Sequence, residues 1–197
     1  MEVKVQNTLK KETGFALLMT LIVVSVVISI GLTVLDLSMK QVRLSTNARE
    51  SEVAFHAANA GMECARYWRR IASTTMERGG AITPACFSGT LTTNVVTPVP
   101  AANLSGNGEA FRYSYALTWD LGNHCTQVTA LVASSTAQGA GLTISNMPTL
   151  VSGYPNGNTK TCAAGERCTV LSVRGFNRPC TSVTGYGVVQ REVLLQF

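Results

Sequence analysis

The pattern of polar and apolar positions changes sharply near the start of this 197-residue chain. Residues 1–14 are polar and carry three lysines, whereas the next 21 residues, 15–35, contain no charge and are rich in Val, Ile and Leu. As a helix rising about 1.5 Å per residue, this run would cross the roughly 30 Å hydrocarbon core of a bilayer. We therefore predict a membrane-spanning helix that ends just before Asp36.

A second pattern, with helical spacing, follows the apolar run. Residues 37–71 contain no proline and one glycine, and their small or apolar residues recur in steps of three and four. Two adjacent rows form one stripe: Leu44, Ala48, Ser51, Phe55, Ala58, Met62 and Ala65, beside Ala54, Ala57, Gly61, Cys64, Trp68 and Ile71. The other face carries charged residues, so we predict one continuous helix, about 85 Å long, whose outer half packs on a domain.

Beyond residue 71 the composition shifts to Thr, Ser, Gly, Asn and Pro, which indicates strands and turns. Residues 72–108 are predicted to form a looped crossover. We expect strands near 91–96, 110–119, 127–132, 169–176 and 188–197, the second and third of which form a hairpin. The fold class that this order predicts is α+β, with a long N-terminal helix whose outer half packs on a small antiparallel β-sheet domain.

We expect three parts: a cytoplasmic leader (1–14), a long helix (15–73) that spans the membrane to about residue 35, and a β-rich head domain (74–197). Lysines before the span favour a cytoplasmic leader, although Lys40 and Arg43 follow it. Six cysteines beyond the span suit an oxidising compartment, so we place the head of a single-pass membrane protein outside the cytoplasm. A cleavable secretory signal does not fit, because its apolar stretch would be about 7 to 15 residues and end in a small-x-small site.

The junction between the leader and the span carries a more specific signal. Lys10-Lys-Glu-Thr-Gly14 is followed directly by Phe15, which resembles the class III signal of type IV pilins and pseudopilins. The resemblance implies that a prepilin peptidase cleaves between Gly14 and Phe15 and that the new amino terminus, on Phe15, is methylated. It also implies the partners: the membrane, other pilin-like subunits that pack on the N-terminal helix, and a pilus assembly platform.

Two further regions carry the resemblance, and one position departs from it. Residues 54–68 resemble a helix segment of minor-pilin-like proteins, and residues 172–180 and 190–197 resemble their closing strands, whereas residues 74–165 match no family.

Typical major pilins carry Glu at the fifth mature position, where its carboxylate pairs with the terminal amine of a neighbouring subunit. Met19 occupies that position here. A charged amine in lipid without a partner is costly, so the departure favours a minor or tip subunit, or a chain that never polymerises, over a bulk subunit.

The six cysteines are expected to form structural disulfides rather than to stay free or bind metal. The pairs that we consider, among fifteen possible connectivities, are Cys162 with Cys168, Cys64 with Cys86, and Cys125 with Cys180. The first pair flanks a turn-like stretch, the second would tie the crossover to the helix, and the third is what remains between strand ends. No Cys-x-x-Cys pair exists and the two histidines lie outside any zinc-ligand spacing, so no metal and no cofactor is expected.

Charge gives the remaining hint about partners. The net charge is +5, or +4 once residues 1–14 are removed. The end of the helix gathers basic and aromatic residues: Arg66, Tyr67, Trp68, Arg69, Arg70 and, further on, Arg78. Such a patch could hold a DNA backbone, but we favour a solvated helix end with the two aromatic residues in the core.

These patterns predict a membrane-anchored pilin-like subunit that is structural rather than catalytic. It would be a minor or tip component of a type IV pilus or a secretion pseudopilus, with its head in the periplasm or outside the cell. Enzymatic activity is not expected, because hydrolase, phosphate-loop, dinucleotide and metalloprotease motifs are absent. The alternative is a single-pass surface-anchored binding or adhesion protein that does not polymerise. Leader processing discriminates between the two, since a pilin loses residues 1–14 and an anchor keeps them.

Overall fold

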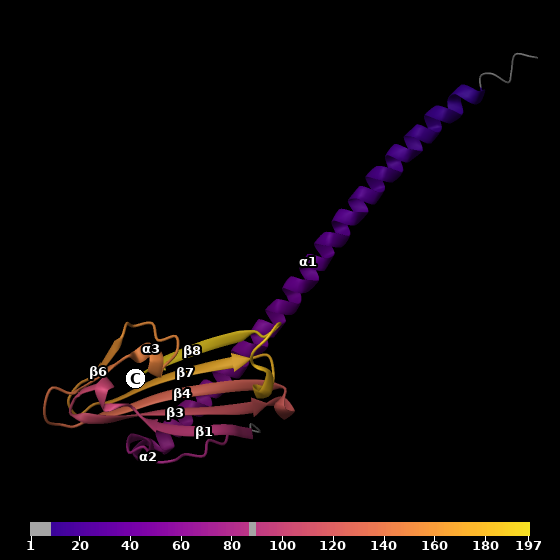
Figure 1. Cartoon of the computed structure of the whole chain (residues 1–197). Helices are drawn as coiled ribbons and strands as arrows, with labels where there is room; N and C mark the ends of the chain where they lie inside the picture. The colour runs from indigo at the N-terminus through magenta and orange to yellow at the C-terminus, as the bar shows by residue number, and fades with distance from the viewer. Residues whose placement is uncertain (1–8, 87–89) are drawn as a thin grey trace, which may run out of the picture. The chain divides into compact units, whose positions relative to one another are not determined.

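The computed structural model describes residues 9–86 and 90–197, so the first eight residues of the predicted leader lie outside the described residues (Figure 1). The chain divides into two compact units, Met1–Ala48 and Arg49–Phe197. The boundary between them falls within one helix, α1, which runs from Leu9 to Ile71.

The first unit is the apolar part of α1. This helix is long and apolar enough to cross a membrane, as the sequence predicts. Three of its hydroxyl groups are paired within the helix: those of Thr20, Ser25 and Thr33 each donate to a carbonyl oxygen one turn earlier, at 2.8–2.9 Å. Such internal pairing is what a helix in hydrocarbon requires.

The second unit is built on an antiparallel sheet whose strands follow the order β1-β3-β4-β7-β8 (Figure 1). These strands are β1 (Thr90–Pro98), β3 (Gly108–Trp119), β4 (His124–Ser135), β7 (Arg167–Phe176) and β8 (Gln190–Gln196). β3 and β4 form a long hairpin in which Gly108 pairs with Ser135 and Trp119 with His124. All five strands coincide with predicted ones, and the predicted hairpin is confirmed.

A second, smaller sheet was not predicted. It has the order β2-β5-β6 and consists of β2 (Leu104–Gly106), β5 (Leu142–Ser145) and β6 (Thr159–Cys162). Together with the one-turn helix α3 (Met147–Leu150), it buries Leu142 and Ile144 against one set of β4 side chains that includes Leu131 and Ala133. β4 is therefore buried on both faces, because its alternate residues Val128 and Val132 belong to the core that faces α1.

The outer half of α1 packs on the main sheet through small residues, which confirms the predicted α+β class. A methyl group added to Gly61 would collide with the side chain of Thr126, and one added to Gly175 would collide with the backbone of Ala54 and Ala58. The hydroxyl of Thr126 donates to the carbonyl oxygen of Ala57 at 2.8 Å. The close approach of helix and sheet thus explains why glycines and alanines line this contact.

The predicted stripe is correct from Ala54 to Trp68 except at Phe55, and it is wrong at Leu44, Ala48 and Ile71. Phe55 and Ile71 are both about half exposed, so they lie outside the contact with the sheet. The contact is narrower than a full apolar stripe, because a helix that approaches a sheet this closely presents few positions to it. Leu44 belongs to the first unit and is exposed.

Three disulfides cross-link the second unit, and they involve α1, the main sheet and the small sheet. The pairs are Cys64–Cys86, Cys125–Cys180 and Cys162–Cys168, the same three that we consider from the sequence among fifteen connectivities. The first ties α1 to the segment that follows it, the second ties the start of β4 to the loop between β7 and β8, and the third joins the small sheet to β7. The first two hold irregular segments to the core, and the third joins strands of the two sheets.

Candidate functional site

The first candidate site is the predicted cleavage junction. Gly14 and Phe15 lie within α1, and a methyl group built on Gly14 would meet no atom within 4 Å. Phe15 and Met19 are exposed, and they lie one helical turn apart on the same face. From Gly14 onward, the proposed cleavage site is therefore open to solvent.

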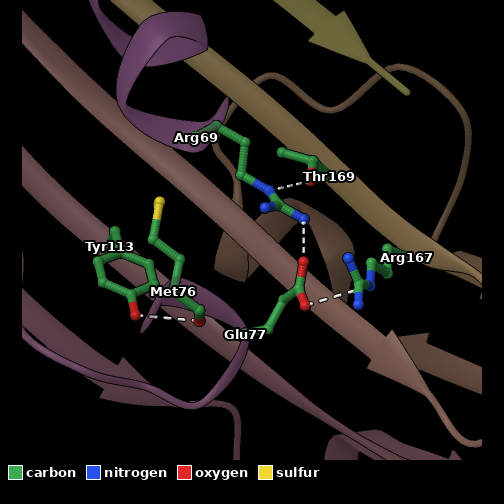
Figure 2. Close-up of polar contacts among 6 residues, drawn as sticks. All are labelled: Arg69, Met76, Glu77, Tyr113, Arg167 and Thr169. Carbon is green, nitrogen blue, oxygen red and sulfur yellow. Dashed lines mark hydrogen bonds and ion pairs between the residues drawn. The ribbon is translucent and has the colours of Figure 1, made fainter. Parts of the chain in front are cut away.

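The second candidate site lies at the other end of α1, where a buried ion-pair network holds the helix to the sheet (Figure 2). Arg69 is only 6% exposed, and its guanidinium donates through Nε to Oγ1 of Thr169 on β7 at 2.8 Å. The same guanidinium contacts Oε1 of Glu77 at 2.9 Å. The second carboxylate oxygen of Glu77 lies 3.2 Å from Nε of Arg167.

This network corrects the interpretation of Arg69 as part of a solvated helix end. The short helix α2 (Ser73–Glu77) follows α1 almost directly and turns the chain back, so that Glu77 lies beside the last turn of α1. Glu77 gave no signal in the sequence, because its partners lie eight residues before it and on a distant strand. A buried guanidinium with no partner would be costly, and Glu77 supplies the required counter-charge.

Tyr113 of β3 fixes the turn that follows α2 (Figure 2). Its hydroxyl lies 3.0 Å from the carbonyl oxygen of Met76 and 3.0 Å from that of Gly80. Burial raises the pKa of the Tyr113 phenol, and the nearby Arg69 guanidinium offsets part of that rise. Burial also raises the pKa of Tyr115, two residues along the same strand.

A cleft of about 770 Å³ lies beside this network, lined by both charged and apolar groups. Its basic side chains are Arg66, Arg69 and Arg70 from α1 and Arg167 from β7. Its carboxylates are Glu63, which pairs with Arg66 at 2.9 Å, and Glu77. Four guanidinium groups against two carboxylates leave the side chains of the cleft with an excess of positive charge. Among the residues that the structure describes, Arg70 forms no ion pair.

The aromatic residues of this region differ from expectation. Tyr67 lines the cleft and is 57% exposed, so it is not a core residue. Trp68 does pack against the core, and its indole nitrogen donates to the carbonyl oxygen of Ala85 at 3.2 Å. Leu195 and Phe197 at the end of the chain form the apolar wall of the cleft. Of the four arginines in the predicted basic patch, Arg78 does not line the cleft.

The cleft can therefore receive an anionic group that carries an apolar neighbour. Its free positive charge comes from guanidinium groups, which bind carboxylate and phosphate oxygens well, and its aromatic and aliphatic wall offers dispersion contacts. No protein-family model matches this chain, and neither does any curated protein or solved structure.

Proposed function

We propose that this chain is a pilin-like subunit, a membrane-anchored structural protein that is cleaved after Gly14 and methylated on Phe15. One observation carries the proposal. Residues 14–48 of α1 are exposed all round, and an uncharged stretch of 21 residues begins immediately after the Lys-Lys-Glu-Thr-Gly junction. The outer half of the same helix packs on an antiparallel sheet, which is the layout that the resemblance implies.

An apolar helix of this kind needs partners that the chain itself does not supply. A helix that is hydrophobic on every side is stable in lipid or among other apolar helices, not in water. Lipid would surround it in the membrane, and helices of other pilin-like subunits would surround it in a filament, where shape and dispersion hold them together. A structural role in an assembly accounts for both environments.

Met19 decides which kind of subunit we propose. In place of the carboxylate that would neutralise a neighbouring amine, the exposed face one turn after Phe15 carries a thioether. We therefore propose a minor or tip subunit that enters filaments beside pilins that carry the acid. Met19→Glu is expected to raise its incorporation along the shaft, which immunogold labelling of intact filaments measures. Dense, uniform labelling by the wild-type protein would contradict the minor role.

We place the head outside the cytoplasm. The three disulfides of the second unit support this orientation, because structural disulfides persist in oxidising compartments. The lysines before the span support it as well, since positive charge favours the cytoplasmic side.

Cleavage is tested with a pair of glycine variants in a cell that contains a prepilin peptidase. Gly14→Val is expected to leave the uncleaved precursor in the membrane, because a branched residue replaces the small residue at the proposed scissile bond. Gly31→Val is the matched control, since a side chain at Gly31 also meets no atom within 4 Å but lies far from the junction. Equal processing of both variants, or no processing of the wild type, would contradict the proposal.

The cleft favours one alternative role that does not require polymerisation. A single-pass anchored protein could use Arg70, Arg167 and Tyr67 to hold an anionic surface group. Such a protein would keep its leader, so the same processing experiment separates the two functions.

A further inference from the structure

The tip of the β3–β4 hairpin has an unusual backbone. Asp120 and Leu121 both adopt the left-handed conformation, with φ of 50° and 54°. Positive φ is uncommon for residues other than Gly, Asn and Asp, because a side chain on Cβ crowds the backbone there. A leucine at the second position is therefore held there against its own preference.

The leucine contributes nothing to the core in return. Leu121 is 102% exposed, so its whole side chain projects into solvent. A second large apolar side chain at this end of the sheet, Tyr186, is 106% exposed, and its loop is tied to the start of β4 by the Cys125–Cys180 disulfide. Exposure alone would need no explanation, but an exposed apolar residue held in a strained conformation is a candidate for contact with another molecule.

The strained tip also carries a negative charge. The Asp120 carboxylate lies 3.6 Å from Nε2 of His124 and accepts a 3.4 Å hydrogen bond from Asn123. Its side chain nevertheless remains 64% exposed. The tip thus offers an acid followed by an aliphatic side chain.

The arginine-lined cleft lies at the opposite end of the same sheet. Trp119 pairs with His124 at the tip, whereas Ser134 near the end of β4 pairs with Arg167 of the cleft. The ten residue steps from His124 to Ser134 span about 33 Å of extended strand. A contact between the tip of one molecule and the cleft of another would therefore join the molecules head to tail, in a heterologous interface.

We propose that the Asp120–Leu121 tip of one subunit docks into the cleft of a second copy of this chain. Leu121 would pack against Tyr67, Leu195 and Phe197, and the Asp120 carboxylate would pair with Arg70. The contact deepens the proposed function, on which it rests, by naming the head surfaces through which subunits meet. The tip complements the cleft in two ways: its carboxylate matches the arginines, and its leucine matches the apolar wall.

Such a contact is weak by itself. A stable interface buries about 1,200–2,000 Å² in total, and a tip of two or three residues covers much less than this. Pairs or short stacks are therefore expected, with the apolar helices supplying the rest of the association.

The test uses the full chain in detergent micelles, with a photo-cross-linking benzoylphenylalanine in place of Leu121. Copies with and without nitrogen-15 are mixed, irradiated and analysed by mass spectrometry. Mixed-label cross-links from position 121 to residues 63–73 or 195–197 are expected. The same amino acid in place of the exposed Gln138 is the control and should not give them. Mixed-label products that map elsewhere, or none at all, would overturn the proposal.

A charge swap tests the ionic part of the contact. Asp120→Arg should lower the yield of the mixed-label cross-link about tenfold, since hydrogen bonds between charged groups commonly contribute that much. Combining it with Arg70→Asp should restore the yield, and failure to restore it would overturn the assigned pair. Cleavage after Gly14 does not enter this experiment. If the leader is cleaved normally but no cross-link forms, only the proposed contact is contradicted. If the leader is retained, the proposed function is contradicted.

Discussion

Glu77 allows the sharpest prediction about stability, because its carboxylate is the counter-charge of a buried arginine. Glu77→Gln keeps the size of the side chain and removes its charge. Arg69 is only 6% exposed and would then keep a guanidinium that water can hardly reach. Breaking a buried ion pair from one side costs about 3–5 kcal/mol of the free energy of unfolding. In a unit of this size, that loss lowers the melting temperature by about 10 °C.

The matched control is Glu63→Gln on the same cleft. Glu63 pairs with Arg66 at the same 2.9 Å distance, but the two side chains are 65% and 53% exposed. An exposed pair contributes about 0–1 kcal/mol, so distance alone does not set the effect. Thermal unfolding of the full chain in detergent, followed by near-ultraviolet circular dichroism, measures both variants against the wild type.

A double variant separates the charge from the packing. Arg69→Met combined with Glu77→Leu removes both charges and keeps apolar volume in their place, which is often neutral or stabilising for a buried pair. Most of the loss seen in Glu77→Gln should therefore be recovered. The reasoning is refuted if Glu77→Gln costs no more than Glu63→Gln, or if the double variant is as unstable as Glu77→Gln.

Three further predictions concern the second unit. Burial raises the folded-state pKa of Tyr113 and Tyr115 above the ordinary value of 10.0, so their phenols ionise first in the unfolded chain. The free energy of unfolding should therefore fall as the pH rises above 10. Urea unfolding across that pH range measures the fall, and a free energy that does not change with pH would contradict it. Replacing Cys64 and Cys86 together by serine should cost about 3 kcal/mol in the chain-entropy model, measured by urea unfolding, and an unchanged midpoint would count against the role of that staple. Leu121→Asn should leave the fold intact and raise the melting temperature slightly, since asparagine tolerates positive φ; a lower melting temperature would show that Leu121 supports the fold.

The sequence is most informative where a local pattern determines the structure. The charge-free run, the helical stripe and the alternation along the strands each extend over many residues. The sequence could therefore predict α1 and the five strands of the main sheet. β5 and β6 have four residues each, in segments rich in Gly, Ser and Thr, and their pairing depends on remote partners. Nothing local distinguishes them from loops.

The site was harder to predict than the fold for a related reason. Spacing places Arg66, Arg69 and Arg70 on one end of the helix, but it does not tell which of them is buried. That depends on where α2 returns the chain and on which strand supplies Thr169. The sequence analysis favours a core position for Tyr67, whereas the structure places it on the wall of the cleft.

The most direct test of the central claim is the mass of the native amino terminus. The protein is isolated from the envelope of cells that produce a prepilin peptidase, and its N-terminal peptide is sequenced by tandem mass spectrometry. The account predicts a chain that begins at Phe15 and carries one methyl group on its α-amine. A mature chain that still contains Lys10, Lys11 and Gly14 would contradict it.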